Sequence, residues 1–186
     1  MNEVWLEEYF DLYKKPLFNK LVINQLLVLK NALETVHKNG GKTMAMGNGA
    51  SASIASHIST DLSKGASIRT VNFNDANLIT ALSNDYGYEN WMAKAVEIYG
   101  DAGDMVILVS SSGSSKNVIK AAGVAKRMDM KIVTFSGFLA DNPLKQCGDI
   151  NLWVDSKAYN IIENMHMIWL TAVCDAIIGK AEYSVS

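Results

Sequence analysis

The sequence predicts an α/β fold in which a parallel sheet is covered by helices on both faces. Short apolar runs alternate with helical stretches along the chain, and the run MVILV (105–109) is apolar throughout. A strand without polar alternation is typical of a sheet that is buried on both sides. Two segments rich in glycine and serine each follow a strand and open a helix, so we interpret them as crossover turns. Ligands bind beyond the carboxyl ends of such strands.

The first 40 residues are predicted to be helical. Apolar residues recur at helical spacing over 3–37, with a break near Pro16. The triplet Asn39-Gly40-Gly41 indicates a left-handed helix end. After it we expect strands within 42–49, 67–74, 104–113, 131–137 and 149–155. Between and after these strands we expect helices at 51–64, 75–83, 89–99, 115–128 and 158–179.

Composition limits the classes of function. A chain of 186 residues suits one domain. The net charge of −2, without a basic run, argues against direct binding of nucleic acid, and the apolar runs argue against a membrane span. Cys147 and Cys174 form no spacing motif, and no signal peptide is evident, so we expect reduced cysteines in a cytoplasmic protein.

The two crossover turns are MGNGASASIASH (46–57) and VSSSGSSKNVIKAA (109–122). Backbone amides and serine hydroxyls at a helix start suit a phosphate monoester, and Ser115 is expected to cap its helix. Such turns often serve only to reverse the chain, but two at one end of a sheet favour a site. Neither is a phosphate-binding loop ending in Gly-Lys-Ser/Thr or a GxGxxG motif, so we expect no nucleotide cofactor.

Four segments resemble the sugar isomerase (SIS) domain family, in order and with similar spacing. They are GNGASASIASH (47–57), ALSNDYGY (81–88), LVSSSGSSKNVIKAA (108–122) and ENMHMIW (163–169). The similarity is greatest to the phosphoheptose isomerase branch. It implies one SIS domain over 1–186, with a three-layer, flavodoxin-like, five-stranded parallel sheet. It also implies a homotetramer that packs through the N-terminal helical region 1–40.

The resemblance also implies a site for a phosphorylated sugar. The phosphate would be held by serines, and the sugar would lie along the glycine loop, with two polar residues of the SNDYGY turn close by. The phosphate residues would be Ser51, Ser110, Ser111, Ser112 and Ser115. The sugar would lie along Asn48, Gly49 and Ala50, and the two residues of the SNDYGY turn are Asn84 and Asp85. The family has a second glycine at the Ala50 position.

The catalytic positions depart from the family pattern. The family has a histidine and then a glutamate where this chain has His57 and Asp61. On the last helix it has a glutamine and two histidines, and this chain has Glu163, His166 and Thr171. The second histidine, an acid or base in the family, is therefore missing.

The residue spacing nevertheless predicts a reactive cluster. His57 and Asp61 share a helix face, as do Glu163 and His166, and both faces are expected to converge near the glycine loop. Asp61, Glu163 and His166 would supply the acid and base of an enediol isomerisation. Alternatively, all four would hold zinc or another divalent metal, which some phosphoheptose isomerases carry. A local surface pair and a core histidine are the simpler readings of these spacings.

Two functional hypotheses follow. The first is an intracellular aldose–ketose isomerase of phosphorylated sugars, converting sedoheptulose 7-phosphate to a heptose 7-phosphate or acting on a related phosphosugar. The second is a noncatalytic SIS module that binds a sugar phosphate or a partner protein. The loops decide which sugar is bound, and the resemblance suggests a role in supplying heptose for surface polysaccharide.

Overall fold

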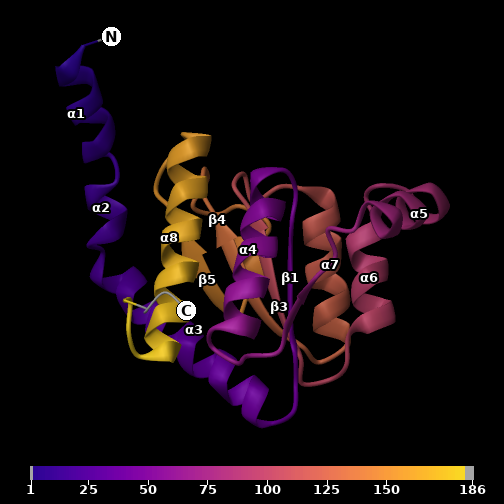
Figure 1. Ribbon diagram of the computed structural model, residues 1–186. Helices are drawn as coiled ribbons and strands as arrows, with labels where there is room; N and C mark the ends of the chain where they lie inside the picture. The colour runs from indigo at the N-terminus through magenta and orange to yellow at the C-terminus, as the bar shows by residue number, and fades with distance from the viewer. Residues whose placement is uncertain (1, 183–186) are drawn as a thin grey trace.

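The computed structural model describes residues 2–182 and contains a five-stranded parallel sheet in the order β2-β1-β3-β4-β5 (Figure 1). This is the predicted flavodoxin-like order. All five predicted strands are confirmed, and each is shorter than the sequence segment that contains it. They are β1 (Thr43–Gly47), β2 (Thr70–Asn72), β3 (Met105–Ser110), β4 (Lys131–Ser136) and β5 (Ile150–Trp153).

The predicted helices are also present. The N-terminal region forms three helices because the chain breaks on either side of the short segment that contains Pro16. Gly40 has a φ of +85° just after the third helix, which confirms the predicted left-handed end. The helices are α1 (Glu3–Asp11), α2 (Lys14–Leu17), α3 (Lys20–Lys38), α4 (Ala50–Lys64), α5 (Ala76–Tyr86), α6 (Trp91–Tyr99), α7 (Lys116–Arg127), the 3-10 turn η1 (Lys145–Cys147) and α8 (Tyr159–Ile178).

Helices cover both faces of the sheet. On one face, α3, α4 and α8 pack over a core that includes Leu33, Ile58 and Trp169. On the other face, α5, α6 and α7 enclose a second core around Met92 and Val118 (Figure 1). The residues of β3 are buried from end to end, as the unbroken apolar run predicts.

The chain reverses its winding direction between β1 and β3. From β1 the chain adds β2 on one side, and from β3 it adds β4 and β5 on the other. Gly47, the last residue of β1, lies opposite Val109 near the end of β3. The loops that leave these two strands therefore start side by side at the topological switch point, where ligands bind in sheets of this kind.

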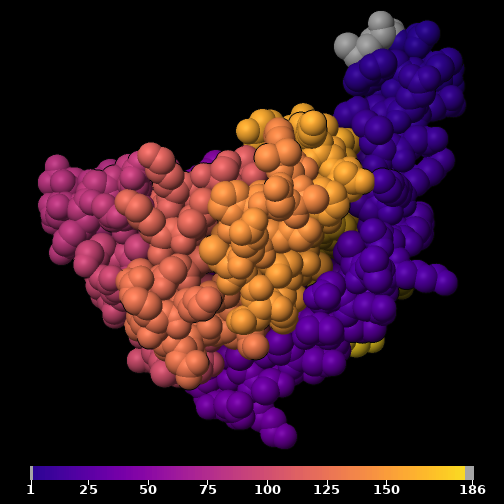
Figure 2. Space-filling view, turned by 180° about the vertical axis from the view of Figure 1, so that it is seen from behind, coloured from indigo at the N-terminus to yellow at the C-terminus, as the bar shows by residue number. Residues whose placement is uncertain are grey.

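Helices α1 and α2 project from the body of the protein, whereas α3 packs on the core (Figures 1 and 2). No residue of α1 is buried. Large apolar side chains remain exposed along α1 and the first half of α3, which is more apolar surface than one chain covers. They are Val4, Trp5, Leu6, Phe10, Leu12, Phe18, Leu21, Ile23, Leu27 and Val28.

Within the described residues, α8 is long and apolar enough to cross a membrane by length and composition alone. Its position explains this composition differently. Ile162, Met165 and Leu170 are among its buried residues, and the helix packs against α3, α4 and the sheet. The helix is therefore apolar because it forms part of the core.

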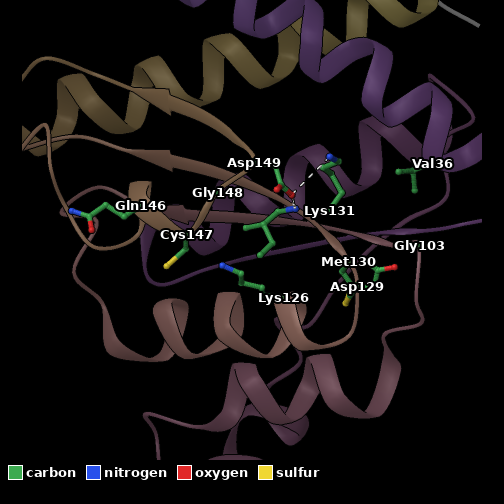
Figure 3. A pocket seen from close by; sticks show the side chains of 11 residues that line it. Val36, Gly103, Lys126, Asp129, Met130, Lys131, Gln146, Cys147, Gly148 and Asp149 are labelled. Carbon is green, nitrogen blue, oxygen red and sulfur yellow. Dashed lines mark hydrogen bonds and ion pairs between the residues drawn. The ribbon is translucent and has the colours of Figure 1, made fainter.

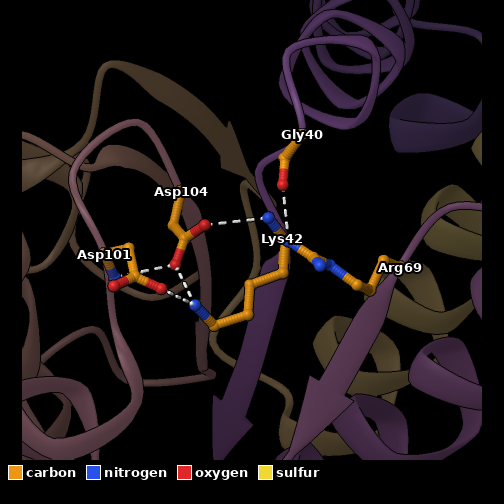
Figure 4. Close-up of polar contacts among 5 residues, drawn as sticks. All are labelled: Gly40, Lys42, Arg69, Asp101 and Asp104. Atoms are coloured by element: carbon orange, nitrogen blue, oxygen red, sulfur yellow. Dashed lines mark hydrogen bonds and ion pairs between the residues drawn. The ribbon is translucent and has the colours of Figure 1, made fainter.

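A buried ion pair closes the amino-terminal end of the sheet (Figure 4). The Lys42 ammonium lies 2.5 Å from an Asp104 carboxylate that is only 2% exposed, and it also contacts Asp101 at 2.7 Å. Burial alone would raise the pKa of Asp104, but hydrogen bonds from Lys42 and the Asp101 amide outweigh burial and lower it. This network ties β1 to β3 at the end opposite the two loops.

We expect Asp104→Ala to lower the free energy of unfolding by about 2–4 kcal/mol, because it leaves the Lys42 ammonium largely buried with one exposed partner. Since the pKa of Asp104 is lower in the folded state, its contribution is present at neutral pH and is lost as the pH falls through that pKa. Urea unfolding measures the change. Asp101→Ala is the control, with a loss under about 1 kcal/mol. An equal effect of both substitutions would contradict the account.

Candidate active site

A cavity of about 180 Å³ lies where the two loops meet at the switch point. It is bounded by the ends of β1 and β3, the first turns of α4 and α7, and the first turns of α8. All of its lining residues except Val109 carry a polar group in the side chain, and they come from segments far apart in the sequence. The lining residues are Asn48, Ser51, Val109, Ser110, Ser111, Ser112, Ser115, Tyr159 and Glu163.

The glycine loop requires its glycines. A Cβ on Gly47 would lie 2.6 Å from the Ser51 carbonyl, so only glycine lets β1 turn directly into α4. Gly49 has a φ of +56°, which favours glycine, and it stands at the start of α4. This tight turn brings the Ser51 side chain to the cavity on the first turn of the helix.

The second loop, residues 110–115, is called the serine loop, and the buried side chain of Asn142 supports it. Gly113 has a φ of +65°, and a Cβ there would overlap the side chain of the buried Asn142. The predicted helix cap at Ser115 is wrong in its detail. Ser115 occupies the N-cap position, but its hydroxyl pairs with the Ser110 hydroxyl at 3.1 Å, whereas Asn117 accepts the Val118 amide at 3.0 Å. The serine hydroxyls are thus held together at the start of α7.

Neutral donors surround this cavity. The first amides of α7 lie at the positive end of its dipole, and apart from the Val118 amide, which Asn117 Oδ1 accepts, they have no acceptor within the helix. Ser112 and Ser114 exchange a hydroxyl contact of 3.0 Å beside them. No lysine or arginine belongs to the lining residues. The arrangement suits an anion that is bound by dipoles and hydroxyls.

One carboxylate faces the same cavity. Glu163, on the second turn of α8, accepts a hydrogen bond from the Ser111 hydroxyl at 3.2 Å. Ser111 is held from the other side, because its carbonyl accepts the Gly137 amide at 2.8 Å. Glu163 is therefore fixed against the serine loop, as the predicted convergence of α8 on the glycine loop requires.

The structure brings together six of the ten predicted sugar-phosphate residues. Two others, Gly49 and Ala50, lie exposed at the edge of the same loop. The expectation for Asn84 and Asp85 differs from the structure, because both are exposed on the last turn of α5 and hydrogen bond to each other at 3.0 Å. The six that line the cavity are Asn48, Ser51, Ser110, Ser111, Ser112 and Ser115.

Two residues missed by sequence reasoning reach Asn48. The Tyr88 hydroxyl donates to Asn48 Oδ1 at 3.0 Å, and Asn117 exchanges two amide hydrogen bonds with Asn48, at 2.9 and 3.0 Å. Tyr88 belongs to the same SNDYGY turn whose earlier residues were expected here. The contact between Tyr88 and Asn48 joins two loops that are distant in the sequence, so no regular residue spacing predicts it.

The predicted His57–Asp61 pair is present on α4, with His57 Nε2 2.9 Å from Asp61 Oδ2. Both side chains are substantially exposed, at 55% and 39%. Asp61 lines a second cavity of about 370 Å³ between α4 and α8, together with Thr171 and Cys174.

Burial, followed by the charges of Asp61 and Asp175, raises the pKa of the Cys174 thiol to about 11, so this thiol is not a nucleophile at neutral pH.

The catalytic prediction for His166 is wrong in this structure. Its ring is completely buried, packs edge-on against Phe135, and places Nε2 3.1 Å from the Ser136 carbonyl. A three-residue step keeps the two side chains within about 60° of each other around the helix axis but moves them one turn along it. Glu163 therefore reaches the Ser111 hydroxyl while His166, one turn further along α8, packs against Phe135 in the core. His166 thus supports the end of β4, next to Gly137 and the serine loop.

The four predicted metal donors do not form one set within a single chain. Among residues 2–182, no group of three His, Cys, Asp or Glu side chains lies close enough to hold a metal ion. His57 and Asp61 bond to each other, Glu163 bonds to Ser111, and His166 is buried against Ser136. The predicted single cluster is therefore corrected to one exposed pair, one cavity carboxylate and one core histidine.

A larger cavity of about 600 Å³ lies at the opposite end of the sheet (Figure 3). Its lining includes Lys126, Cys147 and Asp149, and the Lys131 ammonium lies 3.9 Å from the Asp149 carboxylate. It stands at the amino ends of the strands and includes no helix start. The smaller cavity at the switch point is therefore the better candidate, because helix dipoles and crossover loops converge there.

Burial lowers the pKa of His166 to about 4, although its backbone hydrogen bond opposes the shift. An unfolded histidine binds a proton below about pH 6.5. The unfolded state therefore binds more protons between pH 6.5 and 4, and stability should decline as the pH falls through that window. In an NMR titration we expect the His166 ring signals to stay constant down to pH 5. A His166 midpoint near 6.5 would contradict this assignment.

Comparison with known proteins agrees with this geometry. Residues 23–137 match the family model described as SIS domain. A curated phosphoheptose isomerase of Helicobacter pylori (strain HPAG1) is 39% identical over 152 residues, which cover 78% of each chain. Another, from Aliarcobacter butzleri, is 35% identical and covers 80% of each.

Solved structures give the same result over nearly the full length. The phosphoheptose isomerase of Neisseria gonorrhoeae superposes with a TM-score of 0.85 at 28% identity, covering 94% of this chain and 95% of that one. The corresponding protein of Francisella tularensis also gives 0.85, at 26% identity, covering 97% and 100%. From these matches and the loops described above, the chain belongs to the SIS domain family and, within it, to the phosphoheptose isomerases.

Proposed function

We propose that this protein interconverts sedoheptulose 7-phosphate and a heptose 7-phosphate through an enediol. The observation that carries this proposal is the cavity at the switch point, where serine hydroxyls, a helix start and the Glu163 carboxylate converge. Its likeness to proteins named phosphoheptose isomerase supports the choice of substrate. The protein is accordingly an aldose–ketose isomerase of phosphorylated sugars.

The phosphate binds at the serine loop. Ser51, Ser112 and Ser115 present hydroxyls from the starts of two helices, and the first amides of α7 add donors of fixed direction. Charge-assisted hydrogen bonds of this kind are shorter and stronger than neutral ones. The phosphate is thus the anchor from which the rest of the sugar is positioned.

The sugar extends beyond this cavity. At about 180 Å³ the cavity is smaller than the roughly 300–1,000 Å³ of typical small-molecule sites, so it holds the phosphate end of the substrate. Asp61 is ten residues beyond Ser51 on α4, or about 15 Å along the helix axis. Carbons 1 and 2, which react, are at the far end of the carbon chain from a 7-phosphate. In this proposal they lie on the side of the cavity that faces Asp61.

Asp61 is the general base in this arrangement. It takes a proton from carbon 1 of the ketose and returns it to carbon 2, while the hydroxyl proton moves from oxygen 1 to oxygen 2 by way of His57. The 2.9 Å contact between the two side chains orients the ring for this exchange. His57 then performs the proton exchange that a histidine at the Thr171 position would otherwise perform.

Glu163 has a different role. Because it hydrogen bonds to Ser111 in the serine loop, it lies near the phosphate end and away from the reacting carbons. Its second carboxylate oxygen accepts hydrogen bonds from the hydroxyls of the sugar chain where the chain leaves the cavity. It aligns the chain and does not move the carbon-bound proton.

The zinc implied by the resemblance stays a proposal for the assembled protein. The donors of one chain do not fit the metal, and a set around His57 and Asp61 would need donors from a second copy. The steps above use the side chains alone.

We also propose a cytoplasmic location, since a phosphorylated sugar is an intracellular metabolite.

Asp61→Asn should reduce kcat on sedoheptulose 7-phosphate by roughly 10²–10⁴-fold, the range for loss of a general base. Glu163→Gln should mainly raise KM, because a neutral amide oxygen accepts the sugar hydroxyls more weakly than a carboxylate does, and the base stays in place. A coupled assay for the aldose product measures both. Glu97→Gln on α6, whose carboxylate pairs with the exposed Lys94, is the matched control and should match the parent protein.

The reverse pattern, with Glu163→Gln inactive and Asp61→Asn active, would make Glu163 the base. If the parent protein gives no product at high concentration, with or without added zinc, while inorganic phosphate still binds, the noncatalytic hypothesis is the better account. The threonine at position 171 is the observation that keeps that second hypothesis in view.

We further propose that four copies assemble through the N-terminal helices. The exposed apolar side chains of α1 and α3 need a cover, and a subunit beside α4 would shield the half-exposed Asp61. Light scattering at micromolar concentration should give four times the chain mass of 20.3 kDa. Replacing Trp5 and Phe10 together by serine should lower that mass. A monomeric parent protein would contradict the proposal.

A further inference from the structure

The amide of Asn48 is oriented by a single backbone group. The Val118 amide, which can only donate, gives its hydrogen to Asn117 Oδ1 at 3.0 Å. Oδ1 of Asn117 is therefore the acceptor for the Asn48 amide as well, at 2.9 Å. It follows that Asn117 Nδ2 is the donor that lies 3.0 Å from Asn48 Oδ1.

The Tyr88 hydroxyl completes this orientation. It meets the same Asn48 oxygen at 3.0 Å, and because that oxygen is an acceptor, the hydroxyl donates. An amide oxygen has two lone pairs, so both are now used. The Asn48 nitrogen has two hydrogens and gives one to Asn117. Toward a ligand in the cavity, Asn48 can only donate, through its second N–H.

We propose that Asn117 and Tyr88 are positioning residues that hold Asn48 as a one-way donor to an oxygen of the sugar. This inference rests on the proposed isomerase function. Because Asn48 lines the cavity that holds the phosphate end, this oxygen belongs to the part of the sugar next to the phosphate. A sugar hydroxyl that needs an acceptor finds none on Asn48. The pair thus selects a sugar oxygen that accepts a hydrogen bond at this position.

The turn that carries Tyr88 is fixed from a second side. Glu89 pairs with Lys116 at 2.8 Å and with Lys120 at 3.2 Å, and the Lys120 ammonium also reaches Asn90 Oδ1 at 2.9 Å. Lys116 is the first residue of α7, the helix that follows the serine loop. Segment 88–90 therefore bridges the glycine loop and the start of α7, and Tyr88 is its link to the glycine loop.

The test uses Tyr88→Phe, which removes the hydroxyl and keeps the ring. We expect KM for sedoheptulose 7-phosphate to rise about 3- to 10-fold, the effect of one hydrogen bond, while kcat and the affinity for inorganic phosphate stay unchanged. Asn117→Asp keeps the acceptor for Val118 and loses the donor to Asn48, so it should also raise KM, and its added charge should weaken phosphate binding as well. The double variant should raise KM by more than the product of the two, because Asn48 Oδ1 then has no donor.

Tyr86→Phe is the matched control. Tyr86 lies in the same turn region with its ring against Lys94, and the phenyl ring preserves that contact. It should behave as the parent protein. Equal KM for Tyr88→Phe and the parent would overturn the proposal, as would a loss of phosphate affinity that matches the rise in KM.

An NMR measurement separates this proposal from the proposed function. The side-chain amide signals of Asn48 should shift in Tyr88→Phe and stay in place in Tyr86→Phe, whether or not the protein turns over the sugar. If the parent protein is inactive but this shift occurs, the proposed function fails while the orientation of Asn48 stands. If the Asn48 signals do not respond to Tyr88→Phe, the orientation by Tyr88 is wrong.

Discussion

The parallel pairing of β1 with β3 is the constraint on which the site depends. Because Gly47 lies opposite Val109, the glycine loop and the serine loop leave the sheet at the same level and on adjacent strands. Their helices then start side by side, with their positive ends toward one cavity. Each loop alone would be an ordinary tight turn, and the register of the two strands makes them a phosphate site.

The sequence predicts most of this framework. Apolar runs that end in glycine or serine mark β1, β3 and β4, shorter and weaker runs mark β2 and β5, and the two crossover turns locate the site at the carboxyl ends. These features depend on local patterns, which physical rules of burial and turn geometry connect directly to structure. The sequence places Glu163 only near the glycine loop, and the contact with the serine loop through Ser111 comes from the structure.

The errors concern the direction of single side chains. His166 shares a helix with Glu163 and differs by one turn, yet it faces the core because Phe135 and the Ser136 carbonyl occupy that side. Ser115 caps through its position while its hydroxyl contacts Ser110. Tyr88 could not be assigned from the sequence, since its contact depends on how the α5–α6 turn folds back over the glycine loop. Such directions follow from tertiary packing and leave no periodic signal.

Deuterium incorporation tests the central claim most directly. An enediol exchanges its carbon-bound proton with solvent through the base, so incubation of sedoheptulose 7-phosphate with the protein in D₂O should place deuterium at carbon 1 of the ketose or carbon 2 of the aldose. Mass spectrometry and NMR would follow the label. Labelled sugar phosphate that appears with the parent protein is the result we predict. Unlabelled substrate after prolonged incubation with protein that still binds it would contradict an isomerase acting through Asp61.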